Sequence, residues 1–211
     1  MSQQQRGFTL IEIAIVLVII GLLLGGVLKG QELITQAKIK NVANDLNGLS
    51  AAIYGYQDRY KKFPGDDEQA AGRWSGTQAG DGDGNLGGGV AAMLACTSAT
   101  DKSKENCLFW QHLRLAGFVA GDAASTAAPQ NATGGLLQAQ NGALGLSGLV
   151  ICSSNLPGKI ANAIDAQFDD GKPGSGQVRG TNAASALGTP LDVAQTYVDD
   201  GGTTYVICKA P

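Results

Sequence analysis

Residues 6–30 form an apolar segment that is long enough to cross a membrane as a single helix. Between Phe8 and Leu28 its only charged side chain is Glu12. At about 1.5 Å of rise per residue, a helix over residues 8–28 reaches about 30 Å, the thickness of a hydrocarbon core. A carboxylate inside such a span costs free energy, and a single helix offers it no partner. The segment therefore predicts a membrane anchor whose acid pairs with a neighbouring molecule.

The residues that flank this segment argue against a secretory signal peptide. Such a signal has a basic start, then a short apolar core, and then a cleavage site of small residues. Here Arg6 and Gly7 both precede the apolar segment, and no A-x-A-like site follows it. A cut at Gly7 would leave the apolar segment on the mature chain. The sequence therefore predicts an anchor that is retained.

The sequence RGFTLIE at residues 6–12 resembles the processing site of type IV prepilins and of the pseudopilins of type II secretion. In that family a membrane peptidase cuts after the glycine and methylates the new N-terminal residue. The resemblance implies cleavage between Gly7 and Phe8 and N-methylation of Phe8. It also implies that Glu12 serves assembly by facing the N-terminal amine of an adjacent subunit, because opposite charges attract strongly in a low dielectric. Many major pilins carry a proline near the position of Lys29, where this chain has none.

The helix is predicted to continue beyond the membrane to about Tyr60. Apolar residues recur there at steps of three and four, the spacing of one helix face, until Pro64 and Gly65 end the pattern. A continuous helix over residues 8–60 would be about 80 Å long, more than a domain of this size needs. Its first half must therefore pack against lipid or against other copies of the chain. The apolar stripe consists of Ile39, Val42, Ala43, Leu46, Leu49, Ile53, Tyr56 and Tyr60.

We divide the chain into four segments and expect an α+β fold. Residues 1–7 are the leader peptide, 8–30 the membrane-spanning and assembly half of the helix, 31–63 its amphipathic half, and 64–211 a globular head outside the membrane. The head has the length of a single domain. The chain contains 31 glycines, which favours short strands and turns in the head. We expect the long helix to pack on a small antiparallel sheet, which is the plan of type IV pilins.

Several shorter elements are expected in the head. An amphipathic helix over residues 105–116 would end at Gly117, and another helix would start near Asn155 or Pro157 and run to Phe168. A further short helix is expected at 89–96, and strands at 149–152, 177–179 and 203–209.

Four cysteines lie after the membrane segment, and none belongs to a C-x-x-C pair. In an exported head this even number predicts two disulfides, for which three pairings exist. We favour Cys96–Cys107, which closes a short polar loop. We also favour Cys152–Cys208, which joins a central strand to the C-terminal one.

A glycine-rich stretch of alternating oxygen ligands offers a candidate calcium site. The alternation matches the start of an EF-hand loop. The match then fails, because Leu86 occupies the glycine position and Ala92 stands where a bidentate glutamate is needed. A looser calcium loop that borrows Asp66 or Asp67 is the alternative to a plain Asp/Gly turn. The alternating residues are Asp81, Asp83 and Asn85.

No catalytic pattern is evident, and we predict that the chain is not an enzyme. Its one histidine, His112, is expected at a partly exposed helix position, and neither G-x-S-x-G nor H-E-x-x-H occurs. The net charge of −3 and the thin spread of 15 Lys and Arg residues disfavour nucleic acid as a partner.

The expected function is that of a structural subunit of a type IV pilus-like filament. The alternatives are a pseudopilin of a type II secretion system and a minor pilin that acts as an adhesin or binding module. The resemblance implies that the partners are other pilins or copies of the chain, prepilin peptidase and the inner-membrane assembly machinery. It implies a single-pass inner-membrane location before assembly, and then a surface pilus or a periplasmic pseudopilus. Calcium, at Asp81, Asp83 and Asn85, is the only cofactor that the sequence suggests.

Overall fold

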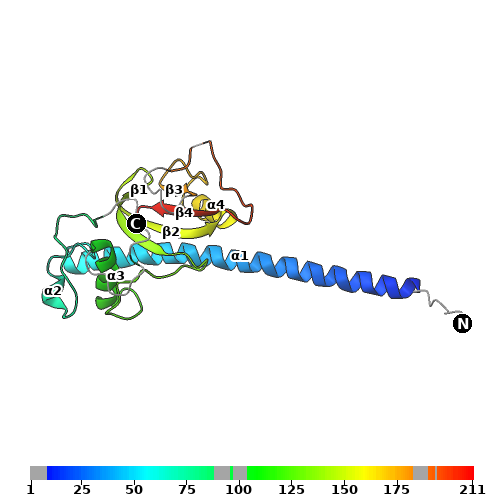
Figure 1. The fold of residues 1–211 in the computed structure, drawn as a ribbon, viewed down its shortest axis with the longest axis horizontal. Helices are drawn as coiled ribbons and strands as arrows, with labels where there is room; N and C mark the ends of the chain where they lie inside the picture. The colour runs from blue at the N-terminus through cyan, green and yellow to red at the C-terminus, as the bar shows by residue number, and fades with distance from the viewer. Residues whose placement is uncertain (1–8, 88–95, 97–103, 183–189, 193) are drawn as a thin grey trace, which may run out of the picture. The chain divides into compact units, whose positions relative to one another are not determined.

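The computed structural model describes residues 9–87, 96, 104–182, 190–192 and 194–211. The expected α+β class is confirmed, since the chain combines four helices with one antiparallel sheet among the described residues (Figure 1). The short helix expected at residues 89–96 falls almost entirely outside the described residues. The elements in chain order are α1 (Leu10–Tyr60), α2 (Ala70–Arg73), α3 (Glu105–Leu115), β1 (Leu137–Ala143), β2 (Leu146–Pro157), α4 (Gly158–Phe168), β3 (Val178–Thr181) and β4 (Thr204–Lys209).

The chain separates into two compact units, Met1–Ala37 and Lys38–Pro211. In the first unit the described residues are Thr9 and the first part of α1. The large apolar side chains there, from Leu10 to Ile34, are all exposed. The helix is long and apolar enough to cross a membrane, and none of its most apolar window is buried within the chain. This surface therefore needs cover from outside the chain.

In the second unit, one face of α1 forms the centre of the hydrophobic core. The buried face matches the apolar stripe expected from the sequence, with Ala52 added and Tyr60 only partly buried. Tyr54 points away from that face and is exposed. The buried residues of α1 are Ile39, Val42, Ala43, Leu46, Leu49, Ala52, Ile53 and Tyr56.

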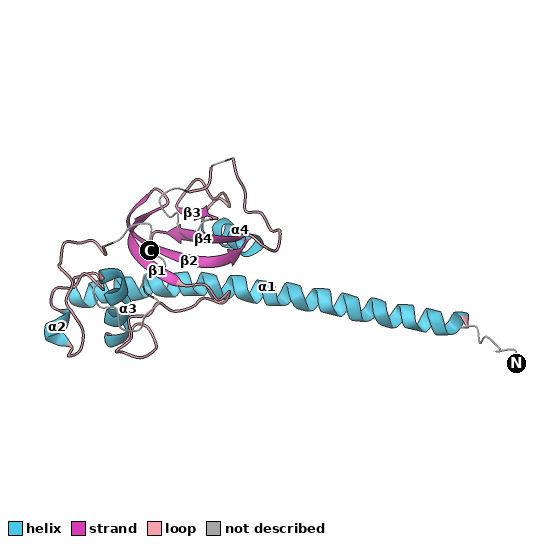
Figure 2. Ribbon diagram, in the orientation of Figure 1, coloured by secondary structure: helices cyan, strands magenta, loops and turns pink. Residues whose placement is uncertain are grey.

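The sheet has the strand order β1-β2-β4-β3, and all its pairs are antiparallel (Figure 2). Alternate residues point to opposite faces. Ile151 and Ile207 lie in the main core with the buried residues of α1 and α4, whereas Cys152 and Cys208 lie in a small second cluster with Val150. The strands expected at 177–179 and 203–209 are present with shifted ends.

The strand expected at residues 149–152 is much longer in the structure, which corrects the expected start of the following helix. Asn155 belongs to β2, not to a helix start, and has a φ of 58°. The register between β2 and β4 shifts between Ser153 and Leu156, as at a bulge. The helix α4 begins only at Gly158, after Pro157.

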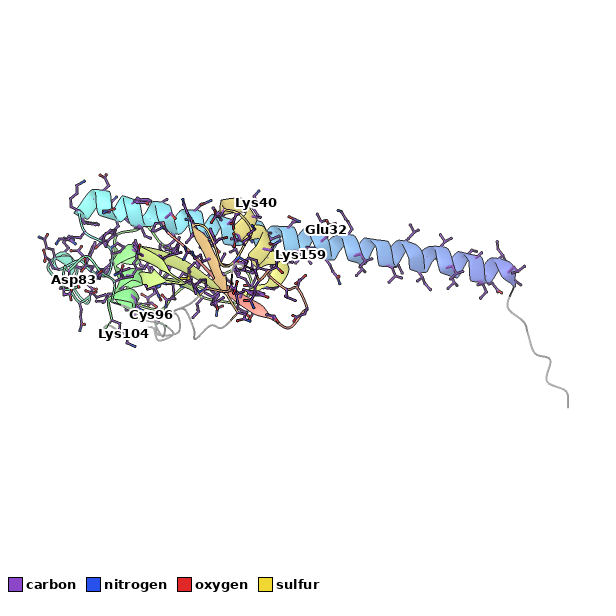
Figure 3. All side chains as sticks on the ribbon, turned by 90° about the horizontal axis from the view of Figure 1, so that it is seen from above. Glu32, Lys40, Asp83, Cys96, Lys104 and Lys159 are labelled. Carbon is purple, nitrogen blue, oxygen red and sulfur yellow. A yellow bond between two sulfur atoms is a disulfide. The ribbon has the colours of Figure 1, made fainter. Side chains whose placement is uncertain are left out.

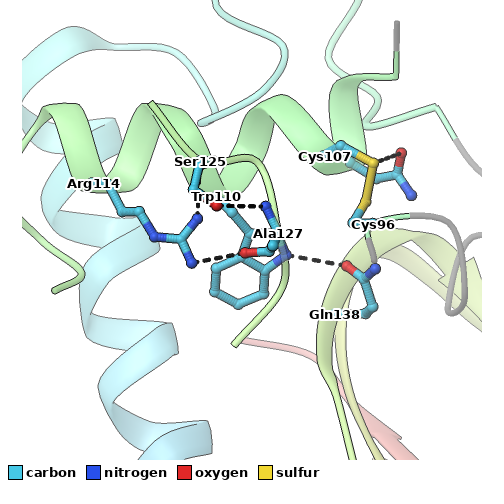
Figure 4. Close-up of a disulfide and its surroundings, with 8 residues drawn as sticks. Cys96, Cys107, Trp110, Arg114, Ser125, Ala127 and Gln138 are labelled. Carbon is cyan, nitrogen blue, oxygen red and sulfur yellow. Dashed lines mark hydrogen bonds between the residues drawn. A yellow bond between two sulfur atoms is a disulfide. The ribbon is translucent and has the colours of Figure 1, made fainter. Parts of the chain in front are cut away.

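The structure contains the two disulfides favoured from the sequence, Cys96–Cys107 and Cys152–Cys208. Cys152 and Cys208 are direct partners across the β2–β4 pair. Beside Cys107, the indole N–H of Trp110 donates to Gln138 Oε1 on β1 at 3.2 Å (Figure 4). One turn further along α3, the guanidinium of Arg114 donates to the carbonyls of Ser125 and Ala127 (Figure 4). These contacts attach α3 to β1 of the sheet and to the loop that precedes β1.

Candidate functional site

The first turn of α1 is closed by a reciprocal pair of hydrogen bonds between Thr9 and Glu12. The Thr9 N–H and the Thr9 hydroxyl each donate to Glu12 Oε2 at 2.8 Å. In return, the Glu12 N–H donates to Thr9 Oγ1 at 3.3 Å. This is a capping box, in which a threonine and a glutamate three residues later satisfy helix-end N–H groups. This cap was not predicted from the sequence, although the pattern T-x-x-E before an apolar segment indicates it.

The carboxylate of Glu12 has no cationic partner among the described residues. The described ion pair in the first unit joins Lys29 to Glu32, more than four helical turns further along α1. Leu10, Ile11 and the apolar side chains that follow are exposed around Glu12. The acid is thus fixed in orientation by its cap while its charge remains available to a cation from another molecule. Gly7 and Phe8 lie outside the described residues.

Residues 2–28 match the prokaryotic N-terminal methylation motif. This is the prepilin-type signature, and it confirms the resemblance drawn from residues 6–12. The prepilin motif supports a member of the type IV pilin and pseudopilin family. No curated protein and no solved structure matches the chain. The likeness to known proteins is thus confined to residues 2–28.

A group of four carboxylates gathers where the segment after α1 meets the start of α3. Asp66, Asp81, Asp83 and Glu105 each contribute one oxygen, and these oxygens all lie within 4.8 Å of one another. The side chain of Asp83 lies on the surface of this unit (Figure 3), whereas Asp66 is only 2% exposed. Of the residues expected to bind calcium, Asp81 and Asp83 belong to this group, together with Asp66, one of the two acids considered as a borrowed ligand. We call this group the acidic cluster.

Two other residues considered as ligands lie outside the acidic cluster. The Asn85 N–H donates to Asp83 Oδ1 at 2.7 Å, and the Asn85 side-chain oxygen accepts from Asn141. Asp67 accepts from the Tyr56 hydroxyl at 2.6 Å and pairs with Arg73. Glu105 was not predicted from the sequence, because it approaches Asp81 only through the packing of α3, 24 positions away in the chain.

Burial and the neighbouring carboxylates disfavour the charged forms of two members of the acidic cluster, Asp66 and Glu105. The pKa of Asp66 is raised, first by burial and then by the charges of Asp83 and Asp81, although backbone N–H groups of the loop oppose this. The pKa of Glu105 is raised by burial and by the same neighbouring carboxylates. Among the described residues, no Lys or Arg forms an ion pair with any of the four. Such a group could bind a metal ion such as calcium.

A second acidic group, Asp165, Asp169 and Asp170, differs in that its oxygens are used within the chain. Asp165 accepts from the Tyr197 hydroxyl at 2.6 Å and from the Gly171 N–H at 3.0 Å. Asp169 and Asp170 accept from N–H and O–H groups of residues 172–178. These contacts fix the turn after α4.

His112 is completely buried, so the expectation of a partly exposed position was wrong. The helix α3 is covered on all sides, since every residue from Asn106 to Leu113 is buried. His112 Nδ1 accepts from the Gly65 N–H, and Nε2 donates to the Gln78 carbonyl, both at 2.9 Å. The neutral ring thereby holds two points of the segment that also carries Asp66. Its pKa is lowered to about 4, mainly because burial disfavours the imidazolium.

We expect the second unit to lose stability as the pH falls from about 6.5 to about 4, in part because of His112. The unfolded chain binds a proton at this histidine below about pH 6.5, whereas the folded chain binds it only near pH 4. The free energy of unfolding therefore falls by up to about 3 kcal/mol across this window. Urea unfolding of the detergent-solubilised chain, followed by tryptophan fluorescence, measures it, because both tryptophans lie in this unit.

The matched variant is His112→Gln, whose side chain can accept and donate but does not titrate. The acids with raised pKa gain protons on folding and oppose the effect of His112; they are Asp45, Asp66, Glu105 and Asp165. The quantity to compare is therefore the loss of unfolding free energy between pH 6.5 and 4, in wild type and in the variant. Wild type should lose more stability than the variant between pH 6.5 and 4. Equal losses would show that His112 is not the group responsible.

Proposed function

We propose that the chain is a structural subunit of a type IV pilus-like filament and assembles through its N-terminal helix. The observation that carries this proposal is Glu12, a capped acid without a described cation at the start of an exposed apolar helix. The prepilin motif at residues 2–28 supports it. Members of families with this motif are structural subunits, and we assign the same role, without enzymatic activity, to this chain.

The exposed apolar face of the first unit has two successive partners in this proposal. Before assembly, lipid covers residues 8–30 in the inner membrane. In the filament, the same surface packs against the helices of other subunits. At Gly21 and Gly25 an added Cβ would meet no atom within 4 Å, so this side of the helix leaves room for close approach of a second backbone. Burial of this surface in the filament then replaces its burial in lipid.

Processing would generate the cation that Glu12 needs. Removal of the leader 1–7 by prepilin peptidase frees the amine of Phe8, which is then methylated and stays cationic. In the apolar centre of a filament, this ammonium and the Glu12 carboxylate of a neighbouring subunit neutralise each other, whereas either charge alone would be costly. Of the remaining segments, residues 31–63 complete the helix and residues 64–211 form the exported head.

The proposal is tested on filaments sheared from cells that express the chain. Mass analysis should find a subunit that begins at Phe8 and carries one added methyl group. The variant Gly7→Glu should keep residues 1–7 and yield no filaments. Gly72→Ala is the matched control, because Gly72 is exposed in the second unit and an added Cβ there meets nothing within 4 Å. A subunit that retains residues 1–7 in wild-type filaments, or filaments that lack the chain, would overturn the proposal.

Deletion of the chain separates the pilus subunit from its two alternatives. Loss of surface filaments identifies a pilus subunit. Loss of protein export identifies a pseudopilin, and loss of adhesion alone identifies a minor pilin with a binding head. Lys29 stands where many major pilins carry a proline. The pseudopilin and the minor pilin are therefore the alternatives to test first.

A further inference from the structure

The helix α3 holds the segment between α1 and α3 at several points. His112 binds the Gly65 N–H and the Gln78 carbonyl. At the other end of the helix, Glu105 Oε1 accepts from the Asp81 N–H at 2.8 Å. Two of the carboxylates that Glu105 approaches, those of Asp81 and Asp83, are exposed. The acidic cluster is thus a point where three parts of the chain converge, but four negative charges meet there.

We propose that Asp66, Asp81, Asp83 and Glu105 bind a calcium ion that joins the segment after α1 to the first turn of α3. This inference is independent of filament assembly and concerns the stability of the head. The ion would convert a repulsive junction into an attractive one. It would neutralise part of the charge of the acidic cluster and give the buried carboxylate of Asp66 a partner.

Asp66 distinguishes this cluster from an ordinary group of surface acids. Its side chain is 2% exposed. Oδ2 accepts from the Gly84 N–H at 3.0 Å. Oδ1 is buried and has no hydrogen-bond partner, the only carboxylate oxygen in that state among the described residues. A buried carboxylate oxygen without a donor is costly. A cation at the cluster would supply the missing partner.

The acids after α4 form an internal comparison. Asp165 is as deeply buried as Asp66, yet both its oxygens accept hydrogen bonds from the chain. That group needs no ion to satisfy its buried acid. The contrast shows that this fold can pair a buried carboxylate from within, which it does not do for Asp66 Oδ1.

The ligand atoms favour calcium over other metals. All four are carboxylate oxygens, whereas zinc and the later transition metals prefer nitrogen or sulfur. Oxygens bound to one Ca²⁺ at about 2.3–2.6 Å lie up to about 5 Å apart, but those around Mg²⁺ lie at most about 4.2 Å apart. The four oxygens lie within 4.8 Å of one another, which a Ca²⁺ ion can span with its flexible geometry, whereas Mg²⁺ demands near-ideal octahedral geometry and releases its waters reluctantly. Waters would complete a calcium shell of 6–8 ligands, which is about two to four more than the cluster supplies.

The experiment measures the melting temperature of the full chain in detergent, first with a chelator and then with CaCl₂ raised to about 10 mM, because the dissociation constants of extracellular calcium modules are about 0.1–1 mM. Tryptophan fluorescence reports on the unit that contains the acidic cluster. We expect Ca²⁺ to raise the melting temperature by about 5 °C or more when it is in hundredfold excess over its dissociation constant. Mg²⁺ at the same concentration should give a smaller shift.

Two variants locate the site. Asp66→Asn removes the buried charge, so it should melt at or above the wild-type temperature in chelator and yet lose most of the calcium shift. Asp83→Asn lies on the surface, should fold normally, and should bind Ca²⁺ at least about tenfold more weakly. Asp170→Asn is the matched control, because Asp170 bonds to Lys172 and Ser175 within the other acidic group, and it should keep the full shift.

The proposal is overturned if wild type shows no calcium shift. It is also overturned if Asp66→Asn and Asp83→Asn keep the full shift, since the ion would then bind elsewhere. An equal shift with Mg²⁺ would overturn the choice of calcium. A reduced or absent calcium shift in Asp83→Asn, together with a full calcium shift in Asp170→Asn, would support the assignment.

Discussion

Replacing Glu12 with glutamine should abolish filament assembly while the precursor stays in the membrane. The amide keeps the size of the side chain but cannot neutralise the N-terminal ammonium of a neighbouring subunit. An ammonium left alone in apolar surroundings costs about 3–5 kcal/mol relative to the pair, which lowers association on the order of a hundredfold or more. Insertion should improve, because the span loses its one charge. Filament yield after shearing, set against membrane-bound chain, measures both effects.

The capping box makes glutamine the informative substitution at this position. Glu12 accepts two hydrogen bonds from Thr9, so a simpler account is that the acid only stabilises the end of the helix. Glutamine serves in a capping box as well as glutamate does. Glu12→Gln therefore removes the charge and retains the cap, whereas Glu12→Ala removes both.

Two control variants complete the test of Glu12. Thr9→Val breaks the cap and keeps the charge, which should cost about 1 kcal/mol of helix stability and leave assembly largely intact. Glu32→Ala removes another acid of α1, one that pairs with Lys29 on the exposed surface; such pairs contribute about 1 kcal/mol or less. Normal filaments from Glu12→Gln together with none from Thr9→Val would show that capping, not charge pairing, is the role of Glu12.

The sequence predicted the elements whose pattern is local. The stripe from Ile39 to Tyr56 follows the helix period, and the structure buries it as expected. The strand β2 was predicted too short, because residues 147–148 and 153–155 are polar or small and carry no alternation. Its length comes from pairing with β1 on one side and β4 on the other. This pairing depends on tertiary contacts, which the sequence of a single segment does not encode.

The same distinction applies to the acidic cluster. The alternation of Asp81 and Asp83 with glycine is a local signal, and those two residues do meet. Glu105 and the buried state of His112 had no local signal. Both depend on α3, which was expected to be amphipathic with an exposed polar face, whereas every residue from Asn106 to Leu113 is buried. Residues that act through the packing of a fully buried helix are found only once the fold is known.

Removing the Cys152–Cys208 disulfide should destabilise the head more than removing Cys96–Cys107. The sequence separations are 56 and 11 residues. In the chain-entropy account, the longer loop contributes about 4 kcal/mol and the shorter about 3 kcal/mol, because each bond restricts the unfolded chain in proportion to the logarithm of its loop. Cys152–Cys208 also joins the two central strands of the sheet.

The comparison uses two double variants, Cys152→Ala with Cys208→Ala and Cys96→Ala with Cys107→Ala. All four cysteines are buried, with exposed fractions of 0–1%, so the cavities left by alanine cost similar free energies and largely cancel. Urea unfolding followed by tryptophan fluorescence should give a lower midpoint for the first pair than for the second, and both below wild type. Equal midpoints for the two pairs would contradict loop length as the cause, and an unchanged midpoint for the first would show that the β2–β4 pairing holds without its covalent bond.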